Sequence, residues 1–159
     1  MPTYFLSAPM RLHIGATIDP GNFGRLMRTM YPAPNTQNPV ATYREALFEY
    51  ARLALSPDKV SRLSCLFVCP TLDGASSFRT AQQPANIVYE VEPTGDTTGM
   101  HIADIDLINF PKAGQFYDGV FTAARKYWLG LEIQNPEVLL PCPVRVVGTP
   151  EGLRNPTFG

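Results

Sequence analysis

Apolar and polar residues follow a helical period in two segments of the chain. In the first, residues 41–55, apolar side chains that include Tyr50 recur at helical spacing and predict a buried stripe. Thr42, followed three residues later by Glu45, has the spacing of a capping box, so we expect the helix to begin there. The second segment, roughly residues 115–129, predicts another helix with one apolar face.

Shorter apolar runs, bounded by proline, glycine and other turn residues, predict β-strands. A short helix is expected around residues 72–82, whereas "DPGNFGR" at 19–25 has the composition of a turn. Short strands in irregular order with two or three helices predict an α+β fold with a mostly antiparallel sheet, in a single domain over residues 1–159. The expected strands cover residues 3–7, 64–69, 86–92 and 102–108, with a further pair inside 137–147 that Pro141 and Pro143 interrupt.

The composition narrows the class of protein. The chain has 159 residues, of which 45% are hydrophobic and 17% charged, as expected for a globular domain. A formal net charge of −1 argues against a broad basic surface for duplex nucleic acid. The chain contains no run of about 18 apolar residues that would predict a membrane span. Its first residues lack the apolar core of a signal peptide, so we expect a cytoplasmic protein with no membrane partner.

The cysteines and histidines give little reason to expect a metal site. Cys65, Cys69 and Cys142 are odd in number, so we expect reduced thiols. Cys65 and Cys69 would lie roughly 13 Å apart along a strand, too far for a disulfide. Their even spacing predicts that both are buried on one face of that strand. With only His13 and His101 to complete a ligand set, no bound metal is expected.

Three charged residues stand at positions where a side chain can be held rigidly. Glu137 opens the otherwise apolar stretch "EVLLPCPVRVV", where it is either the solvated edge of a strand or a catalytic carboxylate. Arg25 follows a rigid turn and Arg62 precedes a core strand, and an arginine held in this way suits a phosphate or a carboxylate. The alternative for either arginine is an internal ion pair with Glu45 or Glu49 on the first helix.

Several stretches, in their order along the chain, resemble a known family. "EVLLPCPVRVV" resembles the last motif of the mono-ADP-ribosyltransferase fold, in which a catalytic glutamate precedes an apolar strand. "LFVCPTLDGA" followed by "IVYEVEPTG" is similar to motifs of the rifamycin-modifying ADP-ribosyltransferases. The pattern also resembles a group of small bacterial and phage domains assigned to that fold, and it extends from about Tyr4 to Val147.

This resemblance implies an ADP-ribosyltransferase-like fold, with strands around a cleft that binds NAD as the substrate. Such enzymes cleave the bond between nicotinamide and ribose, and a carboxylate stabilises the positive charge that develops on the sugar. Glu137 would be that carboxylate, and its replacement by Gln would then abolish activity but change stability by under about 1 kcal/mol. The resemblance implies cofactor-binding roles for Arg25 or Arg62 at the phosphates, for Phe67, Tyr127 or Trp128 as an aromatic wall, and for Tyr4 on the first strand.

Three positions depart from the family pattern. Phe5 stands where the rifamycin-type enzymes have a histidine, and Phe67 where they have a tyrosine. Asn135 replaces the glutamate that arginine-modifying members carry two residues before the catalytic one, which implies an acceptor other than arginine. This leaves another side chain, nucleic acid, a small molecule or water as the acceptor. Among these we expect a macromolecular acceptor, a protein, with NAD as the other partner. The alternative is a catalytically degenerate member of the fold that binds a protein or nucleotide, for example a phage anti-defence protein.

Overall fold

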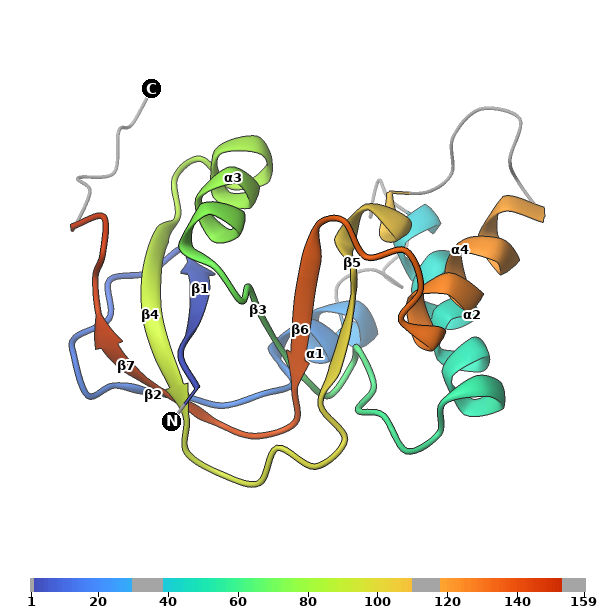
Figure 1. Ribbon diagram of the computed structural model, residues 1–159, viewed down its shortest axis with the longest axis horizontal. Helices are drawn as coiled ribbons and strands as arrows, with labels where there is room; N and C mark the ends of the chain where they lie inside the picture. The colour runs from blue at the N-terminus through green and yellow to red at the C-terminus, as the bar shows by residue number, and fades with distance from the viewer. Residues whose placement is uncertain (1, 30–38, 110–117, 153–159) are drawn as a thin grey trace.

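A computed structural model describes residues 2–29, 39–109 and 118–152. Over these residues the chain forms an α+β fold with antiparallel strands, as the sequence predicts, and four α-helices rather than two or three (Figure 1). Within the described ranges no helix is both long and apolar enough to cross a membrane.

The strands form two antiparallel sheets that together curl into a half-barrel (Figure 1). A backbone bridge between Phe5 and Cys69 joins the sheets, with N···O distances of 2.9 and 2.8 Å. The larger sheet has the order β1 (Tyr4–Ala8), β4 (Ile87–Pro93), β7 (Val144–Gly148), β2 (Thr17–Ile18). The smaller sheet has the order β3 (Leu66–Val68), β6 (Pro136–Leu140), β5 (His101–Asp104).

Two apolar cores hold the helices and sheets together. The first lies within the curled sheets and takes alternate residues of the strands, such as Leu6, Tyr89 and Val138. Helix α3 (Leu72–Gln82) packs on β1 and β4, and Thr71 caps its N-terminus by accepting from the Gly74 amide at 3.1 Å.

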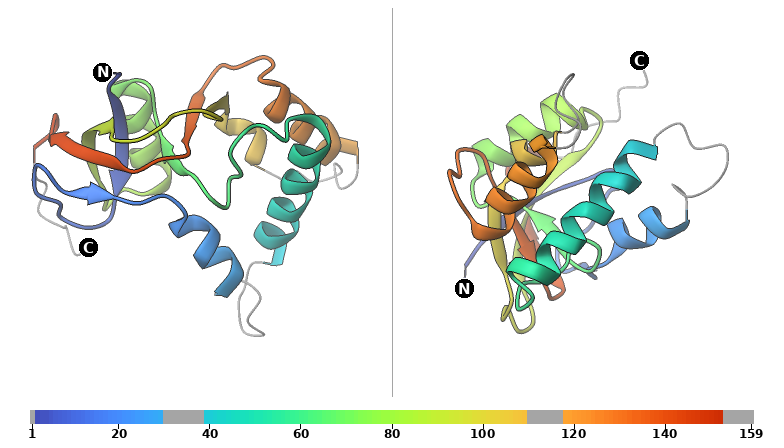
Figure 2. Two further views of the ribbon diagram at one scale, coloured as in Figure 1. Left: turned by 90° about the horizontal axis from the view of Figure 1, so that it is seen from below. Right: turned by 90° about the vertical axis from the view of Figure 1, so that its right-hand side faces the viewer.

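The second core lies at the other end of the molecule, where two long helices pack side by side. These are α2 (Pro39–Leu55) and α4 (Asp118–Leu129), and α4 also packs against β5 (Figure 2). Phe48, Tyr127, Trp128 and Leu139 belong to this core. The predicted start of α4 near residue 115 falls outside the described residues.

The first helix of the structure occupies a segment that we predicted to be a turn. Helix α1 spans Asn22–Thr29, directly after Gly21, whose positive φ of 99° lets the chain turn into the helix. Within this helix, position 24 has room only for glycine, because a Cβ there would come within 1.8 Å of the Leu63 carbonyl oxygen. The glycines of this segment therefore allow close packing as well as a turn.

Two further expectations about helix and strand boundaries are wrong. Helix α2 begins at Pro39, so Thr42 lies inside it, and Glu45 turns inward instead of closing a capping box. Tyr50 is 72% exposed, because the buried face of α2 runs through Glu45 and Phe48. The expected strand over 102–108 ends at Asp104, where a 3-10 helix, η1 (Ile105–Ile108), begins with the Asp104 carboxylate accepting from the Asp106 amide at 2.9 Å.

Candidate functional site

A cavity of about 330 Å³ lies where β1, β3 and β6 meet α1, α3 and η1. Its walls are mainly apolar and aromatic, with Phe23, Phe67 and Phe78 contributed by three different elements. The rings of Phe23 and Phe67 meet edge to face with their centroids 5.3 Å apart. The charged side chains among the residues that line the cavity are Arg62 and Glu137.

The register of the strands explains how residues far apart in sequence reach this cavity. Phe5 pairs with Cys69 across the bridge, and Phe67, two residues before Cys69, projects to the same face. Phe67 pairs in turn with Leu139 of β6, and Glu137 lies two residues from Leu139. Alternation along each strand thus places Phe5, Phe67 and Glu137 on the face opposite the first core, and all three line the cavity.

Glu137 is almost fully buried, yet one of its oxygens is not engaged. Its Oε1 accepts from the Arg62 Nη1 at 2.6 Å and from the Tyr127 hydroxyl at 2.5 Å. Both hydrogen bonds to Glu137 from the described residues end on Oε1, which leaves Oε2 without a donor among them. The strand-edge interpretation of Glu137 is therefore wrong. So is the premise behind the small expected change in stability, namely that Glu137 lies outside a buried network.

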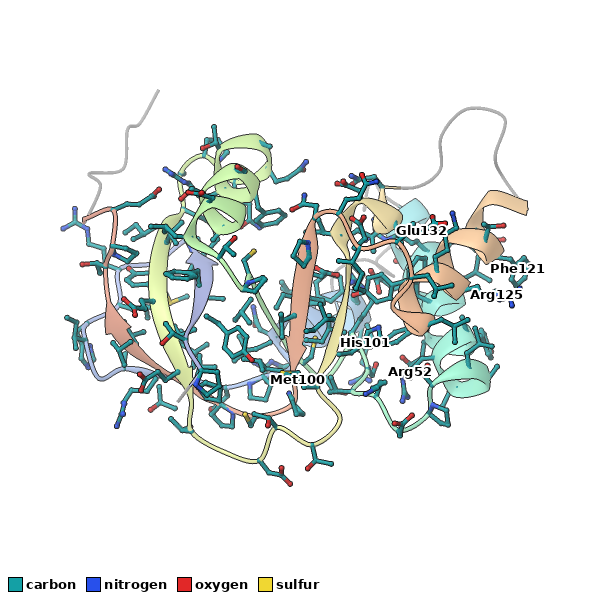
Figure 3. All side chains as sticks on the ribbon, in the orientation of Figure 1. Arg52, Met100, His101, Phe121, Arg125 and Glu132 are labelled. Atoms are coloured by element: carbon teal, nitrogen blue, oxygen red, sulfur yellow. The ribbon has the colours of Figure 1, made fainter. Side chains whose placement is uncertain are left out.

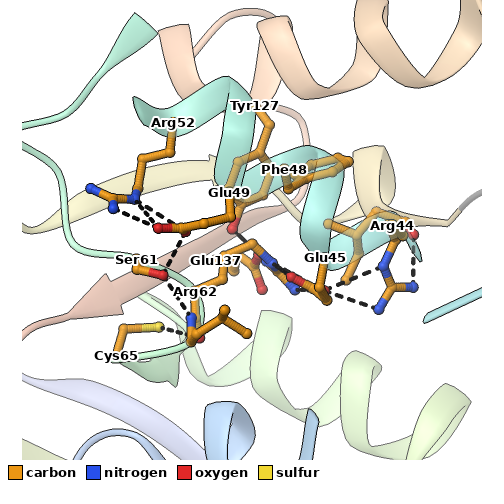
Figure 4. Close-up of polar contacts among 12 residues, drawn as sticks. Arg44, Glu45, Phe48, Glu49, Arg52, Ser61, Arg62, Cys65, Tyr127 and Glu137 are labelled. Atoms are coloured by element: carbon orange, nitrogen blue, oxygen red, sulfur yellow. Dashed lines mark hydrogen bonds and ion pairs between the residues drawn. The ribbon is translucent and has the colours of Figure 1, made fainter. Parts of the chain in front are cut away.

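Arg62, which also lines the cavity, lies between the carboxylates of Glu45 and Glu137 (Figure 4). Its Nε donates to the Glu45 Oε2 at 3.0 Å and its Nη2 to the Glu45 Oε1 at 3.2 Å. The centre of its guanidinium lies 4.7 Å from the ring centroid of Phe67 and 5.2 Å from that of Tyr127. The predicted alternative, an internal ion pair between Arg62 and Glu45, is therefore present, together with the pair to Glu137.

The buried cluster contains equal numbers of positive and negative side chains. Arg44 also donates to the Glu45 Oε1, at 3.1 Å, so two arginines face two glutamates. Burial alone would lower the pKa of Arg62, but the facing Tyr127, Glu137 and Glu45 raise it well above its ordinary value. Burial raises the pKa of Tyr127, so that its hydroxyl stays protonated and donates to Glu137.

Two cysteines also line the cavity and are poor nucleophiles. Cys65 and Cys69 are both free, as predicted, and they flank β3. Cys65 is buried, whereas Cys69 is only partly buried. Burial raises the pKa of Cys69 to about 11 and that of Cys65 further, so both thiols stay protonated at neutral pH.

Three residues with predicted cofactor contacts lie away from the cavity, and a fourth, Tyr127, does not line it either. Arg25 projects from the exposed face of α1. Trp128 is held in the second core, where its Nε1 donates to the Phe48 carbonyl at 2.7 Å and its ring stacks on His101 (labelled in Figure 3). The hydroxyl of Tyr4, a member of the first core, donates to the Met100 sulfur at 3.4 Å.

Tyr127 belongs to the second core and contacts the site from behind: its hydroxyl donates to Glu137 and its ring faces the Arg62 guanidinium. Phe23 and Ile108 are among the cavity residues that the sequence analysis missed. Phe23 lies in the segment predicted to be a turn, where no periodicity marked it as a wall. Ile108 lies in the segment predicted to be a strand, which would have directed its side chain differently.

The fold and the site define the class of this molecule: an α+β protein whose curled antiparallel sheets carry an aromatic cavity above a buried arginine–glutamate cluster. A family model described as "Protein of unknown function (DUF2441)" matches residues 6–152, and the chain belongs to this family. No curated protein matches the chain.

Proposed function

We propose that the cavity binds NAD and that the protein cleaves the bond between nicotinamide and ribose, transferring ADP-ribose to an acceptor other than arginine. One observation carries this proposal. Phe5, Phe67 and Glu137 stand at three positions of the stretches that resemble the ADP-ribosyltransferase pattern, the first two with a changed residue, and the strand register gathers all three around one cavity. The cavity volume of about 330 Å³ also falls within the range of small-molecule sites, at its lower end.

In the proposed reaction the bond between the ribose C1′ and the pyridinium nitrogen breaks. Its electron pair goes to the ring, nicotinamide leaves as a neutral molecule, and positive charge develops on the ribose. Glu137 offers its Oε2 to a ribose hydroxyl and stabilises that charge in a cavity with mainly apolar walls. The acceptor then forms a bond to C1′ and loses a proton. Phe23 and Phe67 provide faces against which the nicotinamide ring packs.

The diphosphate of NAD would be bound by neutral donors. Two carboxylates already engage Arg62, and Arg25 lies outside the cavity lining. Asn22 and Gln83, which do line the cavity, carry side-chain amides that can donate to phosphate oxygens. This arrangement predicts that NAD binding depends only weakly on salt concentration.

A second candidate function is binding of a nucleotide or a protein without chemistry. The observation that favours it is that Phe5 and Phe67 stand where the rifamycin-type enzymes have side chains that form hydrogen bonds. Phenylalanine can pack against a ligand but cannot orient it by hydrogen bonds. The ion pair of 2.6 Å from Arg62 also offsets part of the charge that Glu137 would bring to the reaction.

Incubation with NAD labelled in the nicotinamide ring distinguishes these functions. We expect wild type to release labelled nicotinamide and Glu137→Gln to release it at least about 100-fold more slowly, which corresponds to about 3 kcal/mol of lost transition-state stabilisation. Glu92→Gln, which alters a looser pair with Arg145 outside the cavity lining, is the matched control and should act like wild type. Calorimetric NAD binding without nicotinamide release would favour the second function, and the absence of binding would refute the NAD site.

A further inference from the structure

Arg62 divides its hydrogen bonds unequally between its two carboxylate partners. The edge formed by Nε and Nη2 faces Glu45 and makes two bonds with it, at 3.0 and 3.2 Å. The remaining nitrogen, Nη1, donates to a single oxygen of Glu137 and to the Tyr127 hydroxyl, both at 2.6 Å. Arg62 thus binds Glu45 with two nitrogens and Glu137 with one.

This division of hydrogen bonds decides whether the second oxygen of Glu137, Oε2, remains available to a ligand. An arginine beside a carboxylate favours the two-bond arrangement, which occupies both carboxylate oxygens. If Arg62 adopted it with Glu137, both oxygens of Glu137 would be engaged and none would face the cavity. Because Glu45 occupies that edge of the guanidinium, the Oε2 of Glu137 stays without a protein partner among the described residues.

Glu45 is itself fixed in position. Its side chain is 3% exposed, on the inward face of α2. Arg44 holds it from the other side through Nε and Nη2 at 3.3 and 3.1 Å, while the Arg44 Nη1 is anchored on the Ile108 carbonyl at 3.1 Å. The Arg62 guanidinium also packs against the rings of Phe67 and Tyr127.

We propose that Glu45 is a positioning residue, which keeps the Nε–Nη2 edge of Arg62 away from Glu137 and so keeps the Glu137 Oε2 open to the ligand. The catalytic consequence rests on the proposed function, whereas the geometric statement does not. Glu45 does not line the cavity, and it acts on the ligand only through Arg62 and Glu137.

Glu45→Gln tests this role. Glutamine can accept one of the two Arg62 hydrogen bonds, but its amide NH₂ opposes the other N–H, so the arginine edge is released toward Glu137. We expect kcat for nicotinamide release to fall at least tenfold while KM for NAD changes less than about threefold, because the aromatic walls are intact. A structural role alone would leave the kcat of the folded protein unchanged.

Glu49→Gln is the matched control on the same helix. Glu49 accepts from Arg52 at 2.6 Å and from Ser61 at 2.7 Å and does not line the cavity. Its side chain is 25% exposed and paired with one arginine, so its replacement should lower stability without altering kcat or KM. Equal losses of kcat in the two variants would overturn the assignment of Glu45.

A crystal structure of Glu45→Gln supplies a readout that does not depend on activity. We expect Arg62 to contact both oxygens of Glu137. If it still contacts Oε1 alone, the inference is wrong whatever the protein does with NAD. If Arg62 closes on Glu137 but wild type releases no nicotinamide, the proposed function fails and the role of Glu45 in keeping Oε2 open stands. Should the Gln variant not fold, Glu45→Asp is the substitute. It keeps the charge, but its side chain is one methylene too short to reach Nε and Nη2 of Arg62, and the same two measurements apply.

Discussion

Replacing Glu137 by Gln should cost more stability than a residue at a solvated strand end. The Oε1 of Glu137 accepts from Arg62 and from Tyr127 inside the protein. Hydrogen bonds to a charged group contribute about 1.5–3 kcal/mol each and neutral ones about 0.5–1.5 kcal/mol, so the Tyr127 bond, which becomes neutral, weakens by about 1 kcal/mol. Arg62 stays charged and keeps a hydrogen bond to the Gln oxygen, but it loses one of the two carboxylates that face it, at a further cost of about 1 kcal/mol. The sum is about 2 kcal/mol, which lowers the melting temperature by roughly 4–8 °C in a chain of this length.

Urea unfolding and thermal melts monitored by circular dichroism measure this loss. Glu92→Gln is the control, since its 3.7 Å pair with Arg145 is partly exposed and pairs of this kind contribute under about 1 kcal/mol. We expect the control to melt within about 3 °C of wild type. A Glu137→Gln protein that melts no lower than the control would refute the inference that the ion-pair cluster stabilises the fold.

Three further predictions concern other parts of the molecule. Gly24→Ala should lower the melting temperature despite its better helix propensity, because its Cβ would lie 1.8 Å from the Leu63 carbonyl oxygen; a higher melting temperature would contradict this packing. Burial lowers the pKa of His101, so the unfolded state binds more protons there, and the free energy of unfolding should fall as pH drops below about 6.5. Melts at pH 7 and pH 5 should show this loss, and His101→Gln should reduce it. Titration of the unfolded, unreduced protein should count three free thiols, whereas in the folded protein at pH 8 Cys65 and Cys69 should alkylate slowly; a count of one would indicate a disulfide.

The secondary structure was largely predictable where the chain has a clear period. Strands β1, β4 and β6 and helix α3 lie in the segments for which the sequence predicted them. The errors in the prediction occur where one residue type is typical of two different local structures. Glycine marks both turns and close helix contacts, so α1 was missed. Aspartate marks both a solvated strand face and a cap, so β5 was predicted too long.

The site was predictable in part, because its residues belong to segments with recognisable patterns. Glu137, Arg62 and Phe67 line the cavity together, and an ion pair of Arg62 with Glu45 was among the alternatives. The sequence could not give the division of one arginine between two carboxylates, since that depends on side-chain geometry across β6 and α2. Nor could it assign Trp128 to the second core, because apolar periodicity does not say which of two packed surfaces a helix residue faces.

The bridge between Phe5 and Cys69 has a consequence for local opening of the fold. Both residues line the cavity, and their two backbone hydrogen bonds join the sheets on either side of it. Opening this two-bond bridge costs less free energy than separating a full pair of strands, because fewer hydrogen bonds break together. The amide protons of Phe5 and Cys69 therefore serve as hydrogen-exchange probes of cavity widening, distinct from global unfolding. Any ligand that contacts both sheets should slow their exchange.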